Sequence, residues 1–519
     1  MPDHTAQPVS PQGIGASRGD TQASDEQVLA SFGYRQELRR ALRLFSLYAV
    51  AFSIISITTG ISLNYGFGIN NFGPASIWLW LIAGAGQLLV ALIIAELGTR
   101  IPLAGYAYQW GARLVNSTYG WFVGFTGLMY MAVGGAGITL LATAPLAVSL
   151  FGWNENNPRL VLFVALVLLV LPVLINIISV QLAARVNNLA VATEIVGMVG
   201  FGVALFLLWV AKAKPVHHGL GFLATTTRTG GGPLWYVVAL AGLMGIFTIV
   251  GFELAADLSE EAVQARVTVP KAVIWSVASS VVLGMVALIG FTIAIPDLHA
   301  IQASGLPLVD IVGYWVGGFW TKVFLAIVVF SIFALTVVGA AAQARLAYSM
   351  ARDNMLPFSG ALRRVNPTTR TPIVALVVML VIGAGFMLFG YVNHGGAFGA
   401  LVGATSSLPF IVYLLTILAY VAKRRDMARV PGAFSLGRWA APVMVAALAW
   451  VVLALVIVTF PHEFRKADYV VIGVEVVAAV WYLAVLRGRL QRGTAGVSRL
   501  ADYTPTAQAA APKAEPQLP

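Results

Sequence analysis

The sequence predicts an all-α polytopic membrane protein with about twelve transmembrane helices. Hydrophobic residues make up 59% of its 519 residues and charged residues only 10%, whereas soluble proteins carry roughly 25% charged residues. The apolar residues gather in runs near the length of about 20 residues that crosses a bilayer as a helix. The net charge of +11 is concentrated in alternate connecting segments, which indicates membrane topology rather than a nucleic-acid partner.

The apolar runs divide the chain into a membrane domain at 37–490 and two tails. Residues 1–36 and 491–519 lack apolar periodicity and are expected to be disordered. The third and eighth runs are long enough to extend beyond the bilayer or to tilt strongly. The expected spans lie at about 44–68, 75–100, 117–151, 159–180, 186–211, 234–257, 270–295, 311–350, 372–392, 397–421, 439–460 and 467–486.

The basic residues predict which side of the membrane each connection faces. Arg35, Arg39, Arg40 and Arg43 precede the first run, so the amino end is expected in the cytoplasm. With twelve spans, about 25 of the 32 lysines and arginines then fall on the cytoplasmic side. We therefore expect a multi-pass protein of the cell (inner or plasma) membrane with both termini cytoplasmic.

Several chemistries are disfavoured by the residues that the chain lacks. It has no cysteine, which excludes disulfides, thiolate metal sites and a cysteine nucleophile. Its six histidines fall in tails or predicted external loops, and no HExxH or GxSxG motif lies in a span. No catalytic residue, metal or cofactor is expected. A transporter-like nutrient sensor would need a longer soluble tail, and a channel would need a repeated filter sequence.

The first run carries a cluster of helix-weakening residues at its centre. Ser56, Thr58, Thr59, Gly60 and Ser62 follow one another within seven positions. Serine and threonine compete with the helix by bonding backbone groups, and glycine adds flexibility. The cluster predicts an unwound segment at membrane depth, although a Ser/Thr-rich packing face is an alternative.

The sixth run combines a glycine with a carboxylate inside apolar sequence. Gly251 is followed by Phe252 and Glu253, and the acids Asp257, Glu260 and Glu261 come next. Irregular backbone at membrane depth must line a cavity or lie buried in protein, and a carboxylate there is a functional-site hypothesis. The alternative is a continuous helix in which Gly251 only eases helix packing.

The two interrupted runs stand five spans apart, which predicts two repeats of five helices. The repeats would cover about 44–211 and 234–421, followed by two extra helices at about 439–486. An odd number of spans per repeat places the halves in opposite orientations, and interrupted segments at corresponding positions point to a transporter's binding site. Freed amides would favour a substrate carboxylate and freed carbonyls an ammonium group, a pairing that suits a zwitterion.

Four stretches resemble motifs of the amino acid–polyamine–organocation (APC) superfamily, and most of all its amino acid/choline branch, which includes GABA permeases. They occur in the family's order and lie at 52–61, 96–110, 251–271 and 343–357. The resemblance, over about residues 40–490, implies a LeuT-like fold with a 5+5 inverted repeat and discontinuous first and sixth helices. It also implies alternating access around a central site in a secondary transporter rather than an enzyme.

The resemblance also implies the substrate-binding residues. Thr58, Thr59 and Gly60 would take the carboxylate end of the substrate. Four residues of the sixth run, Phe247, Val250, Gly251 and Phe252, would hold its amine end and side chain. Phe247 stands where the family often places an aromatic gate.

One position departs from the family pattern. The fifth-helix motif at 187–194 ends in lysine in some proton-coupled bacterial permeases, whereas this chain has Glu194. A buried carboxylate next to unwound carbonyls would bind a cation or carry a proton, and hydrogen bonding without titration is the alternative. Glu253, Ser331 and Thr336 are further coupling candidates. Glu96 is expected to pair with Arg100 one helical turn away.

These observations predict a transporter of an amino acid or related amine, coupled to protons. Choline, ethanolamine or polyamine transport, sodium coupling and exchange remain alternatives. A polyamine would favour an acid near the side-chain pocket, and only Glu194 and Glu253 are available for that role. The partners expected are therefore the small-molecule substrate, the coupling proton or sodium ion, and the lipid bilayer.

Overall fold

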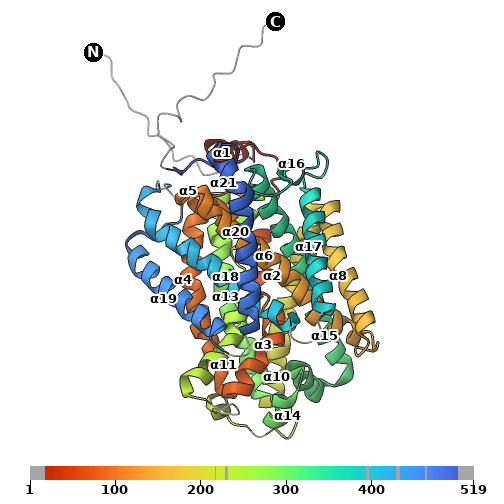
Figure 1. Cartoon of the computed structure of the whole chain (residues 1–519). Helices are drawn as coiled ribbons and strands as arrows, with labels where there is room; N and C mark the ends of the chain where they lie inside the picture. Colours follow the sequence, from red (N-terminus) through yellow and green to blue (C-terminus); the bar gives the residue numbers. More distant parts are fainter. Residues whose placement is uncertain are drawn as a thin grey trace, which may run out of the picture.

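The structure is a computed structural model that describes residues 18–216, 218–227, 232–392, 397–427, 430, 433–461 and 465–500. Throughout these residues the regular structure is helical, apart from an isolated β-bridge between Leu42 and Ala262. Long helices run side by side along the molecule (Figure 1). The prediction of an all-α polytopic membrane protein is confirmed.

Among the described residues, eleven helices are long and apolar enough to cross a membrane, and the shorter apolar helix α11 belongs to one further segment. The expected spans therefore all have helical counterparts. In chain order the segments are α2 (Leu44–Ile55) with α3 (Ile57–Phe72); α4 (Leu79–Arg100); α6 (Ser117–Ile138) with the π-helical turn η2 (Thr139–Thr143) and α7 (Ala144–Leu150); α8 (Pro158–Ile178); α9 (Val180–Glu194) with the π-helical turn η3 (Ile195–Val199) and α10 (Gly200–Val210); α11 (Leu234–Thr248) with α12 (Leu254–Asp257); α13 (Ala265–Ile293); α15 (Pro307–Arg352); α17 (Ile373–Val392); α18 (Ala397–Lys423); α19 (Ala440–Thr459); and α20 (Arg465–Trp481) with the π-helical turn η9 (Tyr482–Leu486) and α21 (Arg487–Gln491).

The eighth segment is longer than a bilayer is thick because α15 consists of two helical pieces that meet at a kink at Gly317. Gly317 within it has φ 77° and ψ 178°, a conformation that is open essentially to glycine alone. The residues before Gly317 therefore form a separate short helical piece, and only the part after it needs to cross the membrane. This accounts for the unusual length that the apolar run predicted.

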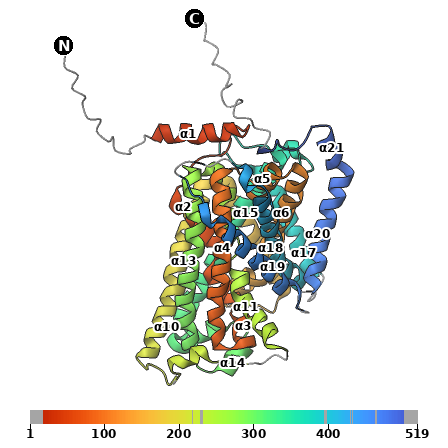
Figure 2. The same ribbon diagram turned by 90° about the vertical axis from the view of Figure 1, so that its left-hand side faces the viewer.

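Short helices cover the two ends of the bundle. α1 (Arg18–Ser31) lies across one end of the bundle, the end at which α5 (Tyr106–Leu114), α16 (Ser359–Leu362) and α21 also lie, and we refer to this as the α1 end (Figures 1 and 2). α14 (Leu298–Ala303) lies at the opposite end (Figure 2). The remaining short elements are η1 (Pro74–Trp78), η4 (Leu220–Ala224), η5 (Ser259–Glu261), η6 (Arg424–Asp426) and η7 (Gly437–Trp439).

The structure differs from the expected disorder at residues 18–36 and 491–500. Asp25 of α1 accepts a hydrogen bond from the Gln264 amide at 2.8 Å and pairs with Arg40 at 3.2 Å, and Leu29 is buried. The Gly496 amide donates to the carbonyl of Asp353 at 2.9 Å. Long-range partners hold both segments, so local composition could not reveal them. Residues 1–17 and 501–519 lie outside the described residues.

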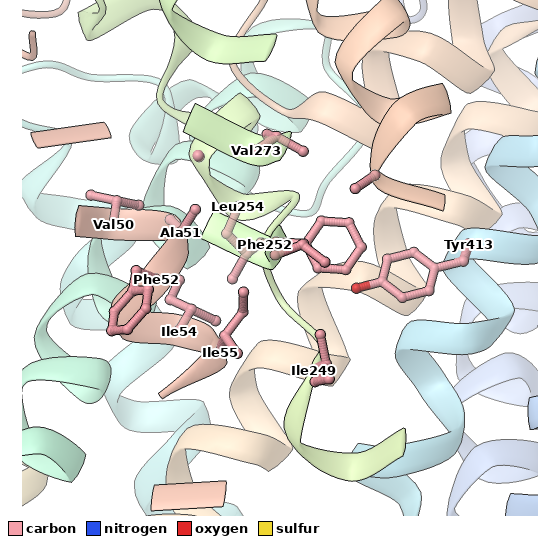
Figure 3. Close-up of a cluster of buried hydrophobic side chains, with 14 of the residues drawn as sticks. Val50, Ala51, Phe52, Ile54, Ile55, Ile249, Phe252, Leu254, Val273 and Tyr413 are labelled. Atoms are coloured by element: carbon pink, nitrogen blue, oxygen red, sulfur yellow. The ribbon is translucent and has the colours of Figure 1, made fainter. Parts of the chain in front are cut away.

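The core surrounds the interruptions of the first and sixth segments. α3 packs along α11, while α2 packs against α9, α12 and α13. Apolar side chains of α2, including Phe52, Ile54 and Ile55, lie beside Phe252 and Leu254 where the sixth segment is interrupted (Figure 3). The two interruptions are therefore held inside protein rather than in lipid, as irregular backbone at membrane depth requires.

Candidate functional site

The first segment is interrupted at Ser56. α2 ends at Ile55, and Ser56 adopts a left-handed backbone with φ 41° and ψ 82°, which costs a non-glycine residue about 1–3 kcal/mol. Its side chain then caps α3, because Ser56 Oγ accepts from the Thr59 amide at 3.3 Å. The interruption thus falls at the first residue of the predicted cluster, and Gly60 lies inside α3.

A buried carboxylate meets this interruption. Glu194, the last residue of α9, is 1% exposed. Its Oε1 accepts from the Thr58 amide at 2.9 Å and from the Ser56 hydroxyl at 3.1 Å. The carboxylate therefore satisfies an amide in the first turn of α3, where the helix dipole favours negative charge. The structure places Glu194 beside the interruption, as its proposed coupling role requires.

The sixth segment is interrupted around Gly251. α11 ends at Thr248 and α12 begins at Leu254, and Gly251 between them has φ 88°. The Gly251 amide donates to the Tyr413 hydroxyl at 3.0 Å, and that hydroxyl donates to Glu253 Oε2 at 2.5 Å. Tyr413 projects from α18 toward the interruption, with its ring stacked on Phe252 (Figure 3). The interruption expected at Gly251 is present.

The two interrupted segments touch each other next to these interruptions. Gly60 of α3 faces Thr248 at the end of α11, and a methyl group at Gly60 would overlap the Thr248 side chain. A methyl group at Gly251 would likewise overlap Ile54 of α2. Both glycines are thus required by close approach, and Gly251 by its backbone conformation as well.

A central cavity of about 470 Å³ opens beside the two interruptions. Its walls are largely apolar and come from α2, α3, α6, η2, α8, α11, α12, α15, α17 and α18. None of the described lining residues is an Asp, Glu, Lys or Arg. The polar lining residues are Thr59, Asn64, Tyr130, Thr248, Thr336, Gln343 and Thr405. Such a cavity suits a small organic molecule held by few polar groups.

The predicted substrate residues fall into two groups around this cavity. Thr59, Gly60, Phe247 and Val250 line it, and Phe247 meets Phe67 edge to face with ring centroids 5.7 Å apart. The other three, Thr58, Gly251 and Phe252, lie behind the wall, where Thr58 and Gly251 use their amides for Glu194 and Tyr413. Phe252 is completely buried.

The two hydroxyl candidates of α15, Ser331 and Thr336, lie in different places relative to the cavity. Thr336 lines the cavity and donates to the Phe333 carbonyl at 2.6 Å. Ser331 is 1% exposed, and its hydroxyl has no hydrogen-bond partner among the described residues. Gly197 faces Ile327 of α15, and the two segments run in opposite directions. Glu194 lies about one turn before Gly197, and Ser331 lies about one turn after Ile327, so the two residues stand at the same level.

Several other acids form ion pairs toward the α1 end, and Glu253 does not. Glu96 pairs with Arg100 as expected and also accepts from Tyr420 at 2.5 Å. Glu253 is bonded by Tyr413 instead of by a loop arginine. The pairs of η5 are buried and link it to α15: Glu260 with Arg352 at 2.9 Å and Glu261 with Arg345 at 2.6 Å.

The chain at residues 25–42, which we call the strap, crosses this end of the bundle. The amides of Ala41 and Leu42 both donate to the Glu261 carbonyl at 2.9 Å. Tyr34 donates to Asp353 at 2.8 Å, and the guanidinium of Arg352 lies 3.5 Å from the centroid of the Tyr34 ring. The strap therefore ties the sixth segment to the end of α15.

Two residues of the site were not singled out from the sequence. Tyr413 bonds the sixth-segment interruption directly, and Gln343 lines the cavity. The Gln343 side-chain nitrogen is buried without a partner among the described residues. Ser56 belonged to the recognised cluster, whereas Tyr413 is 162 residues from Gly251 in sequence and carried no local signal.

Comparison with known proteins gives a match along most of the chain. The family model described as amino acid permease matches residues 42–482. An amino-acid permease of Arabidopsis thaliana is 26% identical over 85% of this chain and 89% of its own length. A GABA-specific permease of Saccharomyces cerevisiae is 25% identical over 93% of this chain and 87% of its own. A thiamine transporter of Schizosaccharomyces pombe is 24% identical over 90% and 86%.

Proposed function

The chain belongs to the amino acid permease family, and on that premise we propose that it is a proton-coupled symporter that moves an amino acid or related amine by alternating access. One observation carries the proposal. The buried carboxylate of Glu194 accepts a hydrogen bond from the Thr58 amide of α3. This contact lies directly behind the cavity wall, where the first and sixth segments are interrupted. A group that can gain and lose a proton thus shares a helix end with the substrate site.

The cavity supports a zwitterionic substrate. The amino end of α3 favours a carboxylate, and the carboxyl end of α11 leaves carbonyls that accept from an ammonium group. Because the described lining residues include no acid or base, a substrate whose own charges balance is held without an uncompensated charge. The same absence of a lining carboxylate weighs against a dication such as a polyamine.

Coupling follows from repulsion between two carboxylates. An ionised Glu194 and a substrate carboxylate at the same end of α3 oppose each other by about 3 kcal/mol at about 5 Å and an effective dielectric constant near 20. Protonation of Glu194 removes this repulsion, so proton and substrate bind together. Release of the substrate on the other side then favours release of the proton.

The distribution of arginines supports an orientation in a cell membrane in which the α1 end faces the cytoplasm. Arg35, Arg39 and Arg370 line a surface groove at this end and are exposed. Positive residues concentrate on the cytoplasmic side of membrane proteins. With this orientation the strap and the ion pairs of η5 lie at the cytoplasmic end of the bundle.

A monovalent organic cation such as choline or ethanolamine is a second candidate substrate. Phe67, Tyr130 and Phe247 line the cavity, and aromatic faces attract ammonium groups. Such a substrate has no carboxylate to compete with Glu194, so its transport would not be linked to protonation by the mechanism above. Substrate identity and coupling can therefore be tested together.

The test is uptake by purified protein in proteoliposomes. Pooled radiolabelled amino acids and amines are offered under a pH gradient or a sodium gradient, for the wild type and for Glu194→Gln. We expect the pH gradient alone to drive accumulation, and Glu194→Gln to retain exchange of internal for external substrate while losing accumulation. Glu96→Gln, which alters a carboxylate outside the site, is a control for general loss of a buried acid.

Two results would contradict the proposal. A requirement for sodium would replace the proton by another coupling ion. Normal pH-driven accumulation by Glu194→Gln would remove Glu194 from the coupling mechanism. Accumulation of choline or ethanolamine without any amino acid would select the second candidate.

A further inference from the structure

The interface between α2 and α9 carries polar side chains at several levels between Glu194 and the α1 end, with buried apolar residues such as Val50 and Val191 between them. Ser46 and Ser53 are seven residues apart on α2, as are Asn187 and Glu194 on α9. Seven residues are close to two helical turns, so each pair lies on one face of its helix. We refer to Ser46, Ser53, Asn187 and Asn188 as the polar seam.

Two hydrogen bonds fix how α2 and α9 are aligned along the seam. Asn188 donates to the Ser46 hydroxyl at 3.4 Å near the α1 end, and the Ser56 hydroxyl donates to Glu194 at 3.1 Å. The order of these contacts shows that α2 and α9 run in the same direction. The six residues from Asn188 to Glu194 cover about 9 Å of helix axis.

Two side chains of the seam, Ser53 midway along it and Asn187 at its α1 end, carry polar groups that have no partner among the described residues. Asn187 is completely buried and Ser53 is 1% exposed. Neither the Ser53 hydroxyl nor the oxygen and nitrogen of the Asn187 amide has a hydrogen-bond partner among the described residues, and the side-chain oxygen of Asn188 also lacks one. Buried polar atoms are rarely left unpaired, and a buried water usually satisfies two to four of them.

We propose that the polar seam holds a file of water that carries protons between Glu194 and the cytoplasm, with Ser53 and Asn187 positioning the water. This inference rests on the proposed function. The proton leaves the Glu194 carboxyl, passes along the hydrogen bonds of the file and emerges at the α1 end, and the carboxylate remains behind. Ser53 and Asn187 donate and accept hydrogen bonds but do not titrate.

The surroundings of the seam suit this role. On α2, Tyr48 lies close enough to Glu194 for electrostatic interaction, but its hydroxyl is paired with Ser279 of α13 at 2.9 Å. The charged side chains at the start of the two helices are the exposed Arg43 and Arg185. Of the α15 candidates, Ser331 reaches the level of Glu194 and lies beyond the seam. A proton leaving Glu194 along the seam therefore meets neutral groups until it reaches the surface.

The experiment compares net transport with exchange in proteoliposomes that contain a trapped pH-sensitive dye. Pooled radiolabelled amino acids are the probe, and the variants are Asn187→Leu, Ser53→Ala and Asn187→Ser. Thr193→Val is the matched control, because its hydroxyl lies on the more exposed side of α9 and bonds only the Leu189 carbonyl. Net uptake requires proton release in every cycle, whereas exchange can proceed with the proton still bound.

We expect Asn187→Leu to slow net uptake and dye-detected proton entry about tenfold, equivalent to about 1.4 kcal/mol in activation free energy, with exchange unchanged. Ser53→Ala should act in the same direction, and Asn187→Ser should restore net uptake because it keeps a group that can bond water. The Thr193→Val variant should match the wild type.

Failure of the inference is distinguishable from failure of the proposed function. If the wild type couples uptake to protons and Asn187→Leu transports at the wild-type rate, the seam does not carry the proton. Equal loss of net uptake and exchange in Asn187→Leu, without rescue by Asn187→Ser, would make Asn187 a packing residue. A wild type whose uptake ignores the pH gradient overturns both proposals.

Discussion

Tyr413 shows how much one hydroxyl can do at the sixth-segment interruption. It accepts from the Gly251 amide and donates to Glu253 Oε2, so a single group bonds both a backbone donor freed by the interruption and one oxygen of a buried carboxylate. Leaving such groups unpaired costs about 1–3 kcal/mol each. The interruption therefore depends on a side chain from α18, a helix that is distant in the sequence.

We predict that Tyr413→Phe lowers the free energy of unfolding by about 2–4 kcal/mol, because it leaves both the Gly251 amide and Glu253 short of a partner. The measurement is thermal unfolding of the purified protein in detergent. Tyr48→Phe is the matched control, since the Tyr48 hydroxyl bonds Ser279 in a half-buried position. Equal melting temperatures for Tyr413→Phe and the control would show that the hydroxyl does not support the interruption.

At this scale the sequence identified some of the site residues and could not identify others. Glu194 was recognisable because a carboxylate inside an apolar run is costly and stands where the family motif has the opposite charge. Tyr413 was not, because its role depends on a contact across 162 residues. Thr58 lay in the predicted cluster, but only the structure shows its amide occupied by Glu194.

Among the elements, the contact between α3 and α11 depends on the absence of a side chain at Gly60. A methyl group there would overlap Thr248, so the two helices would have to move apart next to the cavity. Overpacking of this kind typically costs about 1–3 kcal/mol.

We therefore predict that Gly60→Ala lowers the initial rate of substrate uptake in proteoliposomes by on the order of tenfold or more. Gly66→Ala tests the same chemical change on the same helix, where the added methyl group meets only the Asn70 side chain at 3.7 Å. Its uptake should remain close to that of the wild type. A normal rate for Gly60→Ala would mean that the two segments need not approach so closely during transport.

The element boundaries show which signals are local. The glycine at 251 marked the sixth-segment interruption correctly, because its backbone conformation is one that glycine adopts readily. In the first segment the helix is interrupted at Ser56, four residues before Gly60. Gly60 itself lies inside α3, where its lack of a side chain allows close packing against Thr248. A glycine in an apolar run can therefore mark either an interruption or close packing. For this reason the division of α15 at Gly317 could not be predicted from the sequence.

In the whole molecule, closure of the α1 end joins segments that are remote in sequence. Tyr34 of the strap bonds Asp353 beyond α15, and the strap backbone bonds the Glu261 carbonyl. A hydrogen bond to a charged group contributes about 1.5–3 kcal/mol. Opening toward this end must break these contacts or move them together.

We predict that Tyr34→Ala increases exposure of the cavity toward the α1 end. The chain has no cysteine, so Gly339→Cys can serve as a single reporter, because Gly339 lines the cavity and has open space around it. Labelling by a membrane-impermeant thiol reagent from the α1 end should quicken on the order of tenfold. Phe358→Ala, which removes an exposed ring at the same end, should leave the rate unchanged.

Unchanged labelling in Tyr34→Ala would show that the strap does not hold the closed state.

The strap also shows what could not be predicted from this sequence. Hydropathy and charge distribution yielded the membrane helices and their alternation, because these depend on composition along the chain. Residues 18–36 were expected to be disordered, since the partners that order them lie hundreds of residues away.

The uncharged cavity has a consequence for the energetics of the transport cycle. In the proposed cycle, with a zwitterion bound and Glu194 protonated, the moving part of the loaded protein carries no net charge through the field of the membrane. When empty and deprotonated it carries one negative charge, on which the field acts with about 2.3 kcal/mol per 100 mV if the full potential is crossed. In a cell with a negative interior, the membrane voltage then drives the return of the empty carrier, so in the proposed cycle the voltage acts at the resetting step rather than at the step that carries the cargo.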